Sequence, residues 1–247
     1  MSGVLITRPN PAAQQTARDL QEMGFTPYSA PTLKIDPYDC TLPEASRYAA
    51  LIFTSAQAIK HLMAHPQFSP TYLSLPALCV GDKTQSTAIK HGFTRARSAS
   101  GNAHDLLDLI KRHHAENAPN LPYLYLRGKN TSQPLEEWMN AENIKNHSII
   151  IYQATPTETL EQPIIQAIKD QKISYVLFFS GRSAESFVTL VKKHTLQNNL
   201  SHIKALSISN SVLGYVQELG WERTLHADTP DKQGLYDLLQ RDNLKAL

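Results

Sequence analysis

The chain has 247 residues, of which 41% are hydrophobic and 19% charged, and its formal net charge at pH 7 is +2. This composition is typical of a globular protein long enough for one large or two modest domains. The small charge and the absence of Lys/Arg runs argue against nucleic-acid binding, and the longest apolar runs, such as residues 149–151, are far too short to span a bilayer.

The start of the chain has no basic segment followed by a long apolar stretch, so we predict no signal peptide and a cytoplasmic protein. The two cysteines, Cys40 and Cys79, have no metal-ligand spacing, and we expect them to be reduced thiols. The sequence therefore predicts no metal site, no membrane contact and no nucleic-acid partner.

Short apolar runs typical of buried strands recur along the chain, and helical patterns follow most of them. The first strand is predicted at residues 4–7. Asn10 is predicted to cap the helix that follows, with Pro11 at its first position and Gly24 at its end. Further strands are predicted at residues 51–54, 77–80, 123–126, 148–152, 175–179 and 204–208.

Three later helices are predicted from apolar residues at helical spacing. Asn102 is expected to cap the first of them. Their apolar faces comprise Leu106, Leu107, Leu109 and Ile110, then Ala184, Phe187, Val188 and Val191, and then Val212, Tyr215, Val216 and Leu219. Strands that alternate with helices in this way predict parallel sheets covered by helices on both faces.

Several segments of the first half recur in the second half in the same order. The matching segments are residues 5–8 and 125–127, residues 51–56 and 176–181, and residues 80–84 and 208–212. Each is an apolar run that ends in small polar residues before a helix, which is how an α/β unit presents backbone N–H groups to a ligand. The repeat predicts two similar halves facing a shared cleft, although any two α/β domains show such segments at similar intervals.

Two extended segments are predicted to be linkers. Residues 31–38 are bracketed by prolines, which favour extended backbone, and residues 151–157 also have an extended pattern. A chain that leaves one domain, builds a second and returns makes two such crossings. We therefore predict a discontinuous first domain of residues 1–34 and 154–247, and a second domain of residues 38–150.

The ordered set of motifs resembles the uroporphyrinogen-III synthase family. The resemblance is carried by residues 5–9, 53–56, 80–84, 151–155, 179–184 and 220–221. It implies two flavodoxin-like α/β domains with parallel sheets, joined by a two-stranded linker, and a substrate cleft between them. This sequence departs from the family pattern at Gln57, where Asn is frequent. Ser209 and Val212 also differ from Gly81 and Thr84 of the other half.

The resemblance implies a cofactor-independent lyase that acts on hydroxymethylbilane, a linear tetrapyrrole with an acetate and a propionate on every ring. The substrate loses its terminal hydroxyl as water, its last ring is inverted through a spiro intermediate, and uroporphyrinogen III forms. Uncatalysed closure gives the non-inverted isomer, so the enzyme must hold a flexible polyanion in one conformation. We expect a monomer, which could receive its substrate from hydroxymethylbilane synthase.

Helix N-termini and unpaired backbone amides can hold carboxylates without a lysine for each one. The turns after the predicted strands could supply such donors from both halves. The substrate-binding candidates there are Ser55, Ala56, Gln57, Gly81, Asp82, Lys83, Thr84, Ser180, Gly181, Arg182, Ser183, Ser209 and Ser211.

Tyr152 is the catalytic candidate, at the family's tyrosine position, because a phenol can donate a proton to a departing hydroxyl. It could equally be a tyrosine packed at the domain junction. Arg8 and Arg127 end equivalent strands and are candidates for pairing with carboxylates, but either could have a structural role.

Two other classes of function fit the same architecture. One is a two-domain binding protein for a small anionic solute without catalysis, and the other is an α/β transferase for a sugar phosphate. Fold alone does not separate these functions.

Overall fold

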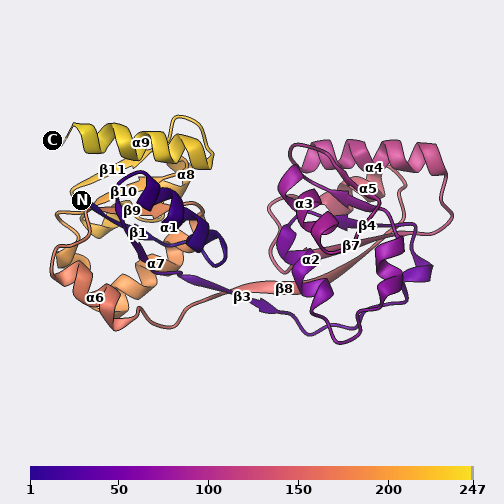
Figure 1. Cartoon of the computed structure of the whole chain (residues 1–247), viewed down its shortest axis with the longest axis horizontal. Helices are drawn as coiled ribbons and strands as arrows, with labels where there is room; N and C mark the ends of the chain where they lie inside the picture. The colour runs from indigo at the N-terminus through magenta and orange to yellow at the C-terminus, as the bar shows by residue number, and fades with distance from the viewer. Residues whose placement is uncertain (246–247) are drawn as a thin grey trace. The chain divides into compact units, whose positions relative to one another are not determined.

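The computed structural model describes residues 1–245, and the chain divides into two compact units (Figure 1). Unit 1 comprises residues 1–35 together with the chain from residue 155 onward, and unit 2 comprises residues 36–154. Each unit is built on one sheet with helices packed against it. The predicted parallel α/β architecture is confirmed.

Unit 1 contains a five-stranded sheet in the order β11-β10-β9-β1-β2, and every neighbouring pair is parallel. The strands are β1 (Gly3–Ile6), β2 (Thr26–Ser29), β9 (Tyr175–Phe178), β10 (Lys204–Ser207) and β11 (Arg223–His226). The helices are α1 (Ala12–Glu22), α6 (Gln162–Lys169), α7 (Gly181–Lys193), α8 (Asn210–Leu213) and α9 (Lys232–Leu244), with short 3-10 turns η3 (Gln197–Asn199) and η4 (Gln217–Leu219).

Both faces of the unit 1 sheet are buried, because successive strand residues point to opposite sides. Leu5 packs into a core formed with α6, α7 and α8, whereas Val4 and Ile6 pack with α1 and α9. This double covering explains why the predicted strands are continuous apolar runs rather than alternating ones.

Unit 2 contains a six-stranded sheet in the order β3-β8-β7-β4-β5-β6. The strands are β3 (Leu33–Pro37), β4 (Ala50–Phe53), β5 (Ala77–Cys79), β6 (Ala96–Ser98), β7 (Tyr123–Gly128) and β8 (Asn146–Pro156). The helices are α2 (Ala56–Met63), α3 (Asp82–Lys90), α4 (Ala103–Asn117) and α5 (Leu135–Ala141), with 3-10 turns η1 (Ala45–Arg47) and η2 (Pro70–Ser74). Leu51 and Phe53 pack toward α2 and α3, while Ala50 and Ile52 pack toward α4 and α5.

The internal repeat predicted from the sequence is confirmed at the level of sheet topology. The order β11-β10-β9-β1-β2 in unit 1 corresponds to the order β6-β5-β4-β7-β8 in unit 2. In both units, a strand followed by a helix leads to its neighbouring parallel strand. The repeated sequence segments lie on equivalent strands or in the turns that directly follow them.

Of the three helix-end residues predicted from the sequence, Asn102 and Gly24 are confirmed and Asn10 is not. Asn102 caps α4 as predicted, because its Oδ1 accepts from the His104 N–H at 2.8 Å and the Asp105 carboxylate accepts in return from the Asn102 N–H at 2.7 Å. Gly24, with φ +83°, follows the end of α1 as predicted. The predicted Asn10 cap is wrong. Within the described chain no side chain caps α1, which begins at Ala12 with Pro11 in the cap position.

The helix predicted through Leu219 is also shorter than expected. Helix α8 ends at Leu213, and the chain continues through turns to η4. Val212, Val216 and Leu219 are buried as predicted, but Tyr215 is 53% exposed. Once the chain leaves α-helical geometry after α8, the spacing of 3.6 residues per turn no longer determines which side chains share a face.

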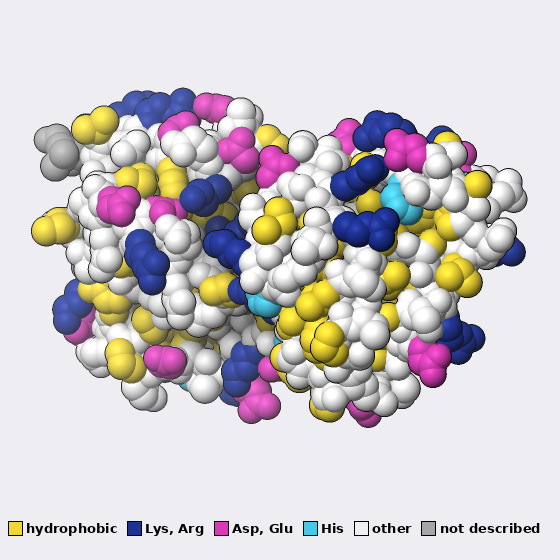
Figure 2. Space-filling view, turned by 45° about the vertical axis from the view of Figure 1, so that its right-hand side comes forward, with side chains coloured by type: hydrophobic (Ala, Val, Ile, Leu, Met, Phe, Trp, Pro, Cys, Tyr) yellow, Lys and Arg dark blue, Asp and Glu magenta, His cyan; other side chains and the backbone are white. Residues whose placement is uncertain are grey.

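Charged side chains of both signs are interspersed on the face shown in Figure 2, in keeping with the low net charge. No helix within residues 1–245 combines the length and the apolar character needed to cross a membrane.

The amino-terminal ends of β9, β10 and β11 are joined by a buried carboxylate from α9. Asp242 Oδ2 accepts from Lys204 Nζ at 2.9 Å and from the Tyr175 hydroxyl at 3.1 Å, and Arg223 lies 3.7 Å from Oδ1. Burial by itself raises the pKa of Asp242, but hydrogen bonds from Lys204 and Tyr175 outweigh it and leave the pKa below its ordinary value.

We expect Asp242→Asn to lower the unfolding free energy of unit 1 by about 2–3 kcal/mol at pH 7, because it removes the nearer counter-ion of Lys204 and leaves Glu222, at 3.8 Å. A carboxyl with a depressed folded-state pKa stabilises the fold above its unfolded pKa, and this contribution is lost as the pH falls through the folded-state value. The difference between variant and wild type should therefore shrink below about pH 4.

Urea unfolding followed by Trp221 fluorescence, in a Trp138→Phe background, measures this change. Asp237→Asn, at an exposed position of the same helix, is the matched control. Equal stabilities of Asp242→Asn and wild type at pH 7 would contradict the assignment.

Candidate functional site

Helices begin directly after neighbouring strands at the carboxyl edge of each sheet. In unit 2, Ser55 and Gly81 are the N-cap residues of α2 and α3, which follow β4 and β5. In unit 1, Ser180 and Ser209 are the N-cap residues of α7 and α8, which follow β9 and β10. The first N–H groups of a helix have no acceptor within that helix, so each edge offers backbone donors from two adjacent turns.

The substrate-binding residues predicted in the turns of unit 2 occupy three kinds of position: a helix cap, a buried site and exposed sites. Ser55 Oγ accepts from the Gln57 N–H at 3.1 Å and so caps α2, where Ala56 is the first residue. Thr84 is buried, whereas Lys83 is exposed. Asp82 is also exposed, and hydrogen bonds from Ser98 and Ser100 lower the pKa of its carboxyl.

Gly81 is open to added side chains. Its backbone is extended, with φ −155°, a conformation that any residue adopts, so no glycine is required for backbone reasons. A Cβ added there would meet nothing nearer than the Gly101 carbonyl oxygen at 3.9 Å. Substitution at this position therefore changes access to the α3 N-terminus without straining the turn.

A polar pocket of about 420 Å³ lies within unit 2 at the carboxyl ends of β4, β5 and β7. Of the predicted residues, Ser55 and Tyr152 line it. The other lining residues are Thr54, Val80, Asn102, Ala103, Tyr125, Gly128, Asn130, Thr131, Ser132, Gln133 and Leu135.

Most of this lining was not predicted from the sequence. The polar run at residues 130–133 directly follows β7, as the predicted turns follow β4 and β5. The same rule, a polar turn after a buried strand, would have identified this run. Asn102 was predicted only as a helix cap, and its place in the pocket depends on how α4 packs against the sheet.

Tyr152 lies against Gly128 on the neighbouring strand. The two residues are paired across β7 and β8 at an irregularity in the register, and the Lys129 N–H donates to the Tyr152 carbonyl oxygen at 2.9 Å. A Cβ on Gly128 would lie 2.7 Å from Tyr152 Cζ and 2.9 Å from its hydroxyl oxygen. The missing side chain at Gly128 therefore makes the space in which the phenol lies.

A second tyrosine lies in the same pocket. Tyr125 is buried on β7, and its hydroxyl is 3.1 Å from Thr54 Oγ1, at the end of β4. Burial raises the pKa of Tyr125, which keeps this phenol protonated at neutral pH. The pocket therefore contains two phenols, and the sequence analysis identified one of them.

Arg127 makes its hydrogen bonds with other residues of unit 2. Its Nε lies 3.0 Å from Glu136 Oε1 and 2.7 Å from Ser148 Oγ, and its Nη1 donates to the Gly128 carbonyl oxygen at 3.1 Å. The side chain is 19% exposed. This geometry corresponds to the structural alternative, in which Arg127 holds the end of β7 in place.

Arg8 in unit 1 is partly buried beside an aromatic ring. Its guanidinium carbon lies 4.2 Å from the centre of the Phe179 ring, and Nη1 is 3.4 Å from Thr16 Oγ1. Its buried Nε finds no hydrogen-bond acceptor within residues 1–245. Burial lowers the pKa of this guanidinium, while Tyr236 and Asp19 act in the opposite direction.

The remaining predicted residues of unit 1 form two helix starts. Ser180 Oγ accepts from the Ser183 N–H at 3.3 Å, Ser183 itself is buried, and Arg182 is exposed. Ser209 and Ser211 pair their hydroxyls at 2.9 Å. Gly181 lies under the ring of Tyr215, since a Cβ there would be 2.6 Å from that ring.

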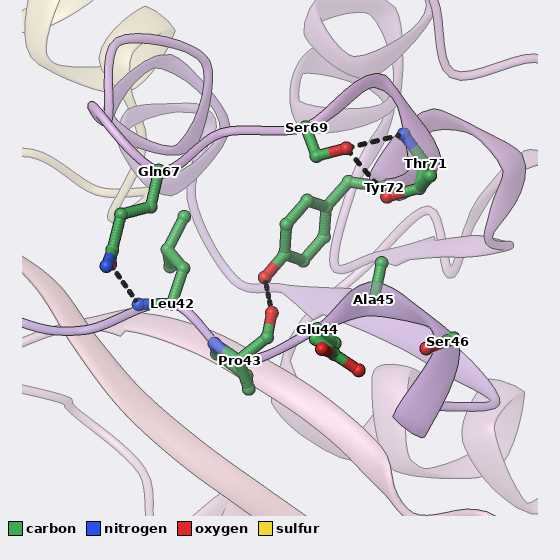
Figure 3. A pocket seen from close by; sticks show the side chains of 9 residues that line it. All are labelled: Leu42, Pro43, Glu44, Ala45, Ser46, Gln67, Ser69, Thr71 and Tyr72. Atoms are coloured by element: carbon green, nitrogen blue, oxygen red, sulfur yellow. Dashed lines mark hydrogen bonds between the residues drawn. The ribbon is translucent and has the colours of Figure 1, made fainter.

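A second pocket, of about 350 Å³, lies near the amino-terminal ends of β4 and β5 (Figure 3). The Tyr72 hydroxyl donates to the Pro43 carbonyl oxygen, and Ser69 Oγ accepts from the Thr71 hydroxyl at 3.0 Å. The hydroxyls of Tyr72, Ser69 and Thr71 are thus hydrogen-bonded within the protein. Among residues 1–245 there is also no group of three or more His, Cys, Asp and Glu side chains arranged to hold a metal ion.

Two α/β units with helix N-termini at the carboxyl edge of parallel sheets define a class of proteins suited to binding small anionic molecules. The sequence model of the family described as Uroporphyrinogen-III synthase HemD matches residues 14–237. A uroporphyrinogen-III synthase from Chlorobaculum parvum is 21% identical over 227 residues, which cover 89% of this chain and 90% of the relative.

Solved structures share the fold. The crystal structure of a uroporphyrinogen-III synthetase from Helicobacter pylori matches with a TM-score of 0.66 at 19% identity, covering 98% of this chain and 99% of that chain. A mutant uroporphyrinogen III synthase from Thermus thermophilus matches with a TM-score of 0.53 at 15% identity, covering 99% and 100%.

Because the family model spans most of its length, this chain belongs to the uroporphyrinogen-III synthase family. Its activity is the cofactor-independent cyclisation of hydroxymethylbilane to uroporphyrinogen III, a lyase reaction of porphyrin and haem biosynthesis. The resemblance seen in the sequence is confirmed, and the alternative of a binding protein without catalysis finds no support.

If Tyr152 takes part in the reaction, as the sequence predicts, Gly128→Ala should reduce the rate of uroporphyrinogen III formation by at least about tenfold, because the added methyl displaces the Tyr152 ring and small misplacements at a reacting centre are costly. Gly81→Ala should cost less, since its added methyl has free space. Initial rates and melting temperatures of both variants test this. A fully active Gly128→Ala enzyme would show that the close approach of Gly128 to Tyr152 has no role in the reaction.

Proposed function

We propose that the polar pocket of unit 2 is where the hydroxyl of hydroxymethylbilane departs, with Tyr152 as the proton donor. The observation that carries this proposal is the position of Tyr152 in a pocket that also contains the N-cap of α2. The phenol gives its proton to the hydroxyl, which leaves as water. The last ring then attacks through its substituted carbon, and the proton finally lost on ring closure restores the phenol.

We propose that the substrate carboxylates are held mainly by backbone N–H groups at helix starts. Each of these starts follows a buried strand, so its donors are fixed in direction before the substrate arrives. The candidate side chains Gln57, Asp82, Lys83, Thr84, Arg182 and Ser211 flank these donors. Preorganised donors limit the conformations of a flexible polyanion, which favours the inverted product over spontaneous closure.

Cellular context follows from the chemistry of the substrate. Because free hydroxymethylbilane closes by itself to the wrong isomer, we propose direct transfer from hydroxymethylbilane synthase to a monomer of this protein. The free thiols Cys40 and Cys79 support a cytoplasmic location.

We further propose that residues 31–38 and 151–157 are linkers. They would join a first functional domain of residues 1–34 and 154–247 to a second domain of residues 38–150.

The test of the activity is the isomer formed from hydroxymethylbilane by the purified protein without added metal or cofactor. We expect the type III isomer of uroporphyrinogen. Chromatography of the oxidised products separates the isomers, with a no-enzyme reaction as the control. Formation of the type I isomer alone would refute the proposal.

Tyr152→Phe should lower the rate of type III formation by roughly 10²–10⁴-fold, the range typical of losing a general acid. The variant keeps the ring and loses the proton donor. Tyr125→Phe in the same pocket distinguishes the two phenols, because a larger loss there would transfer the role to Tyr125. Tyr72→Phe, in the pocket near the amino-terminal strand ends, controls for removal of a buried tyrosine hydroxyl. Its type III rate should remain near that of wild type.

Gly81→Val should weaken product binding more than Lys83→Ala if backbone donors of α3 hold a carboxylate. Valine introduces a branched side chain beside those donors, whereas truncating the exposed lysine removes one screened charge. Anaerobic calorimetric titration with uroporphyrinogen III gives the affinities, after circular dichroism has established folding. Unchanged affinity in Gly81→Val would exclude this turn from the binding site.

A further inference from the structure

We propose that His61 is a positioning residue for the reaction, whose imidazole fixes the Tyr152 ring at the pocket. The proposal rests on the function proposed for Tyr152 and adds how that side chain is held. His61 lies near the end of α2, the helix whose N-cap, Ser55, lines the same pocket. Helix α2 thus supplies a lining residue of the pocket at its start and, near its end, a ring that stacks on the lining residue Tyr152.

The geometry is that of two aromatic rings lying nearly parallel. The ring centres of His61 and Tyr152 are 5.5 Å apart and their planes differ by 12°. The space in which Tyr152 lies is formed by Gly128, where any Cβ would overlap the phenol. A register irregularity in the adjoining strand, between Arg127 and Gly128, accompanies this arrangement, and such irregularities redirect side chains next to functional sites.

The strand pairing, Gly128 and His61 each restrict the conformation of a different part of Tyr152. The strand pairing fixes its backbone, since its carbonyl oxygen accepts from the Lys129 N–H. Gly128 leaves room for the ring, and contact with the parallel His61 ring disfavours the other rotamers of Tyr152. A phenol that must reach one departing hydroxyl benefits from this restriction, because proton transfer requires hydrogen-bond distance in the bound complex.

The charge state of the imidazole suits this role. Burial lowers the pKa of His61, and Lys60 on the same helix acts in the same direction, while Asp36 on β3 opposes them. The ring is therefore neutral at pH 7. A neutral imidazole packs against the phenol without favouring phenolate, whereas an imidazolium would attract the phenolate charge and draw the proton away from the donor.

The test compares His61→Ala, which removes the ring, with His61→Phe, which keeps an aromatic ring and removes ionisation. We expect His61→Ala to lower kcat roughly 10–100-fold. Affinity for uroporphyrinogen III should change by less than about threefold, within the range of small indirect effects. His61→Phe should retain kcat to within about threefold of wild type, because ring packing is preserved.

A double-mutant cycle asks whether His61 acts through Tyr152. In a Tyr152→Phe background, His61→Ala should cause little further loss, because the donor that it positions is already absent. Equal fractional losses in both backgrounds would overturn the proposal, as would wild-type kcat in His61→Ala. Loss of kcat in His61→Phe equal to that in His61→Ala would overturn it too, by assigning the effect to ionisation.

NMR of protein labelled with ¹³C in its tyrosine rings provides a readout independent of the acid assignment. The Tyr152 signal, identified by its disappearance in Tyr152→Phe, should shift in His61→Ala and remain closer to its wild-type position in His61→Phe. An unshifted signal in His61→Ala would refute positioning. Full activity of Tyr152→Phe, by contrast, would refute the proposed acid, and a shifted ring signal would then still support the contact of His61 with Tyr152.

Discussion

The common direction of all five strands of unit 1, and of β4 to β8 in unit 2, is the constraint on which the rest of the structure depends. The edge strand β3 of unit 2 runs antiparallel to its neighbour, β8. Parallel strands end at one edge, so every helix that follows a strand begins there. Ser55 and Gly81 in unit 2, and Ser180 and Ser209 in unit 1, are consequently brought to the carboxyl edges of their sheets. Backbone donors accumulate at that edge without any requirement for a basic sequence, which accords with the net charge of only +2.

Two basic side chains at strand ends are used for structure. Arg127 is committed to Glu136 and Ser148, and Lys204 to Asp242. An enzyme for a substrate with many carboxylates can thus keep few free cations at its site, because oriented amides and helix N-termini supply directional attraction. Fixed donors also select one conformation of a flexible substrate, which a mobile lysine does less well.

The proposed reactive part of the site, the pocket around Tyr152, depends on a missing side chain as much as on functional groups. Gly128 leaves the space that Tyr152 fills, and its neighbour in the chain, Arg127, holds the strand end. Tyr125 and Thr54 add two further hydroxyls, 3.1 Å apart, to the same pocket. A phenol is a weak acid, so the role proposed for Tyr152 requires accurate placement of its hydroxyl, and this placement depends on the residues around it.

The sequence by itself determined the class of fold, the order of most strands and helices, the helix starts at Ser55, Gly81, Ser180 and Ser209, and the family. These follow from local patterns: apolar runs, capping residues and motifs that occur in the same order in both halves of the chain. The tertiary structure decided the rest. In the folded structure Tyr215 is exposed, and α1 begins after Asn10, at Ala12. Tyr125, Gly128 and the polar run at residues 130–133 line the same pocket as Tyr152. Such neighbours come from different strands, and contacts between strands depend on sheet order and register, which no local pattern of residues specifies.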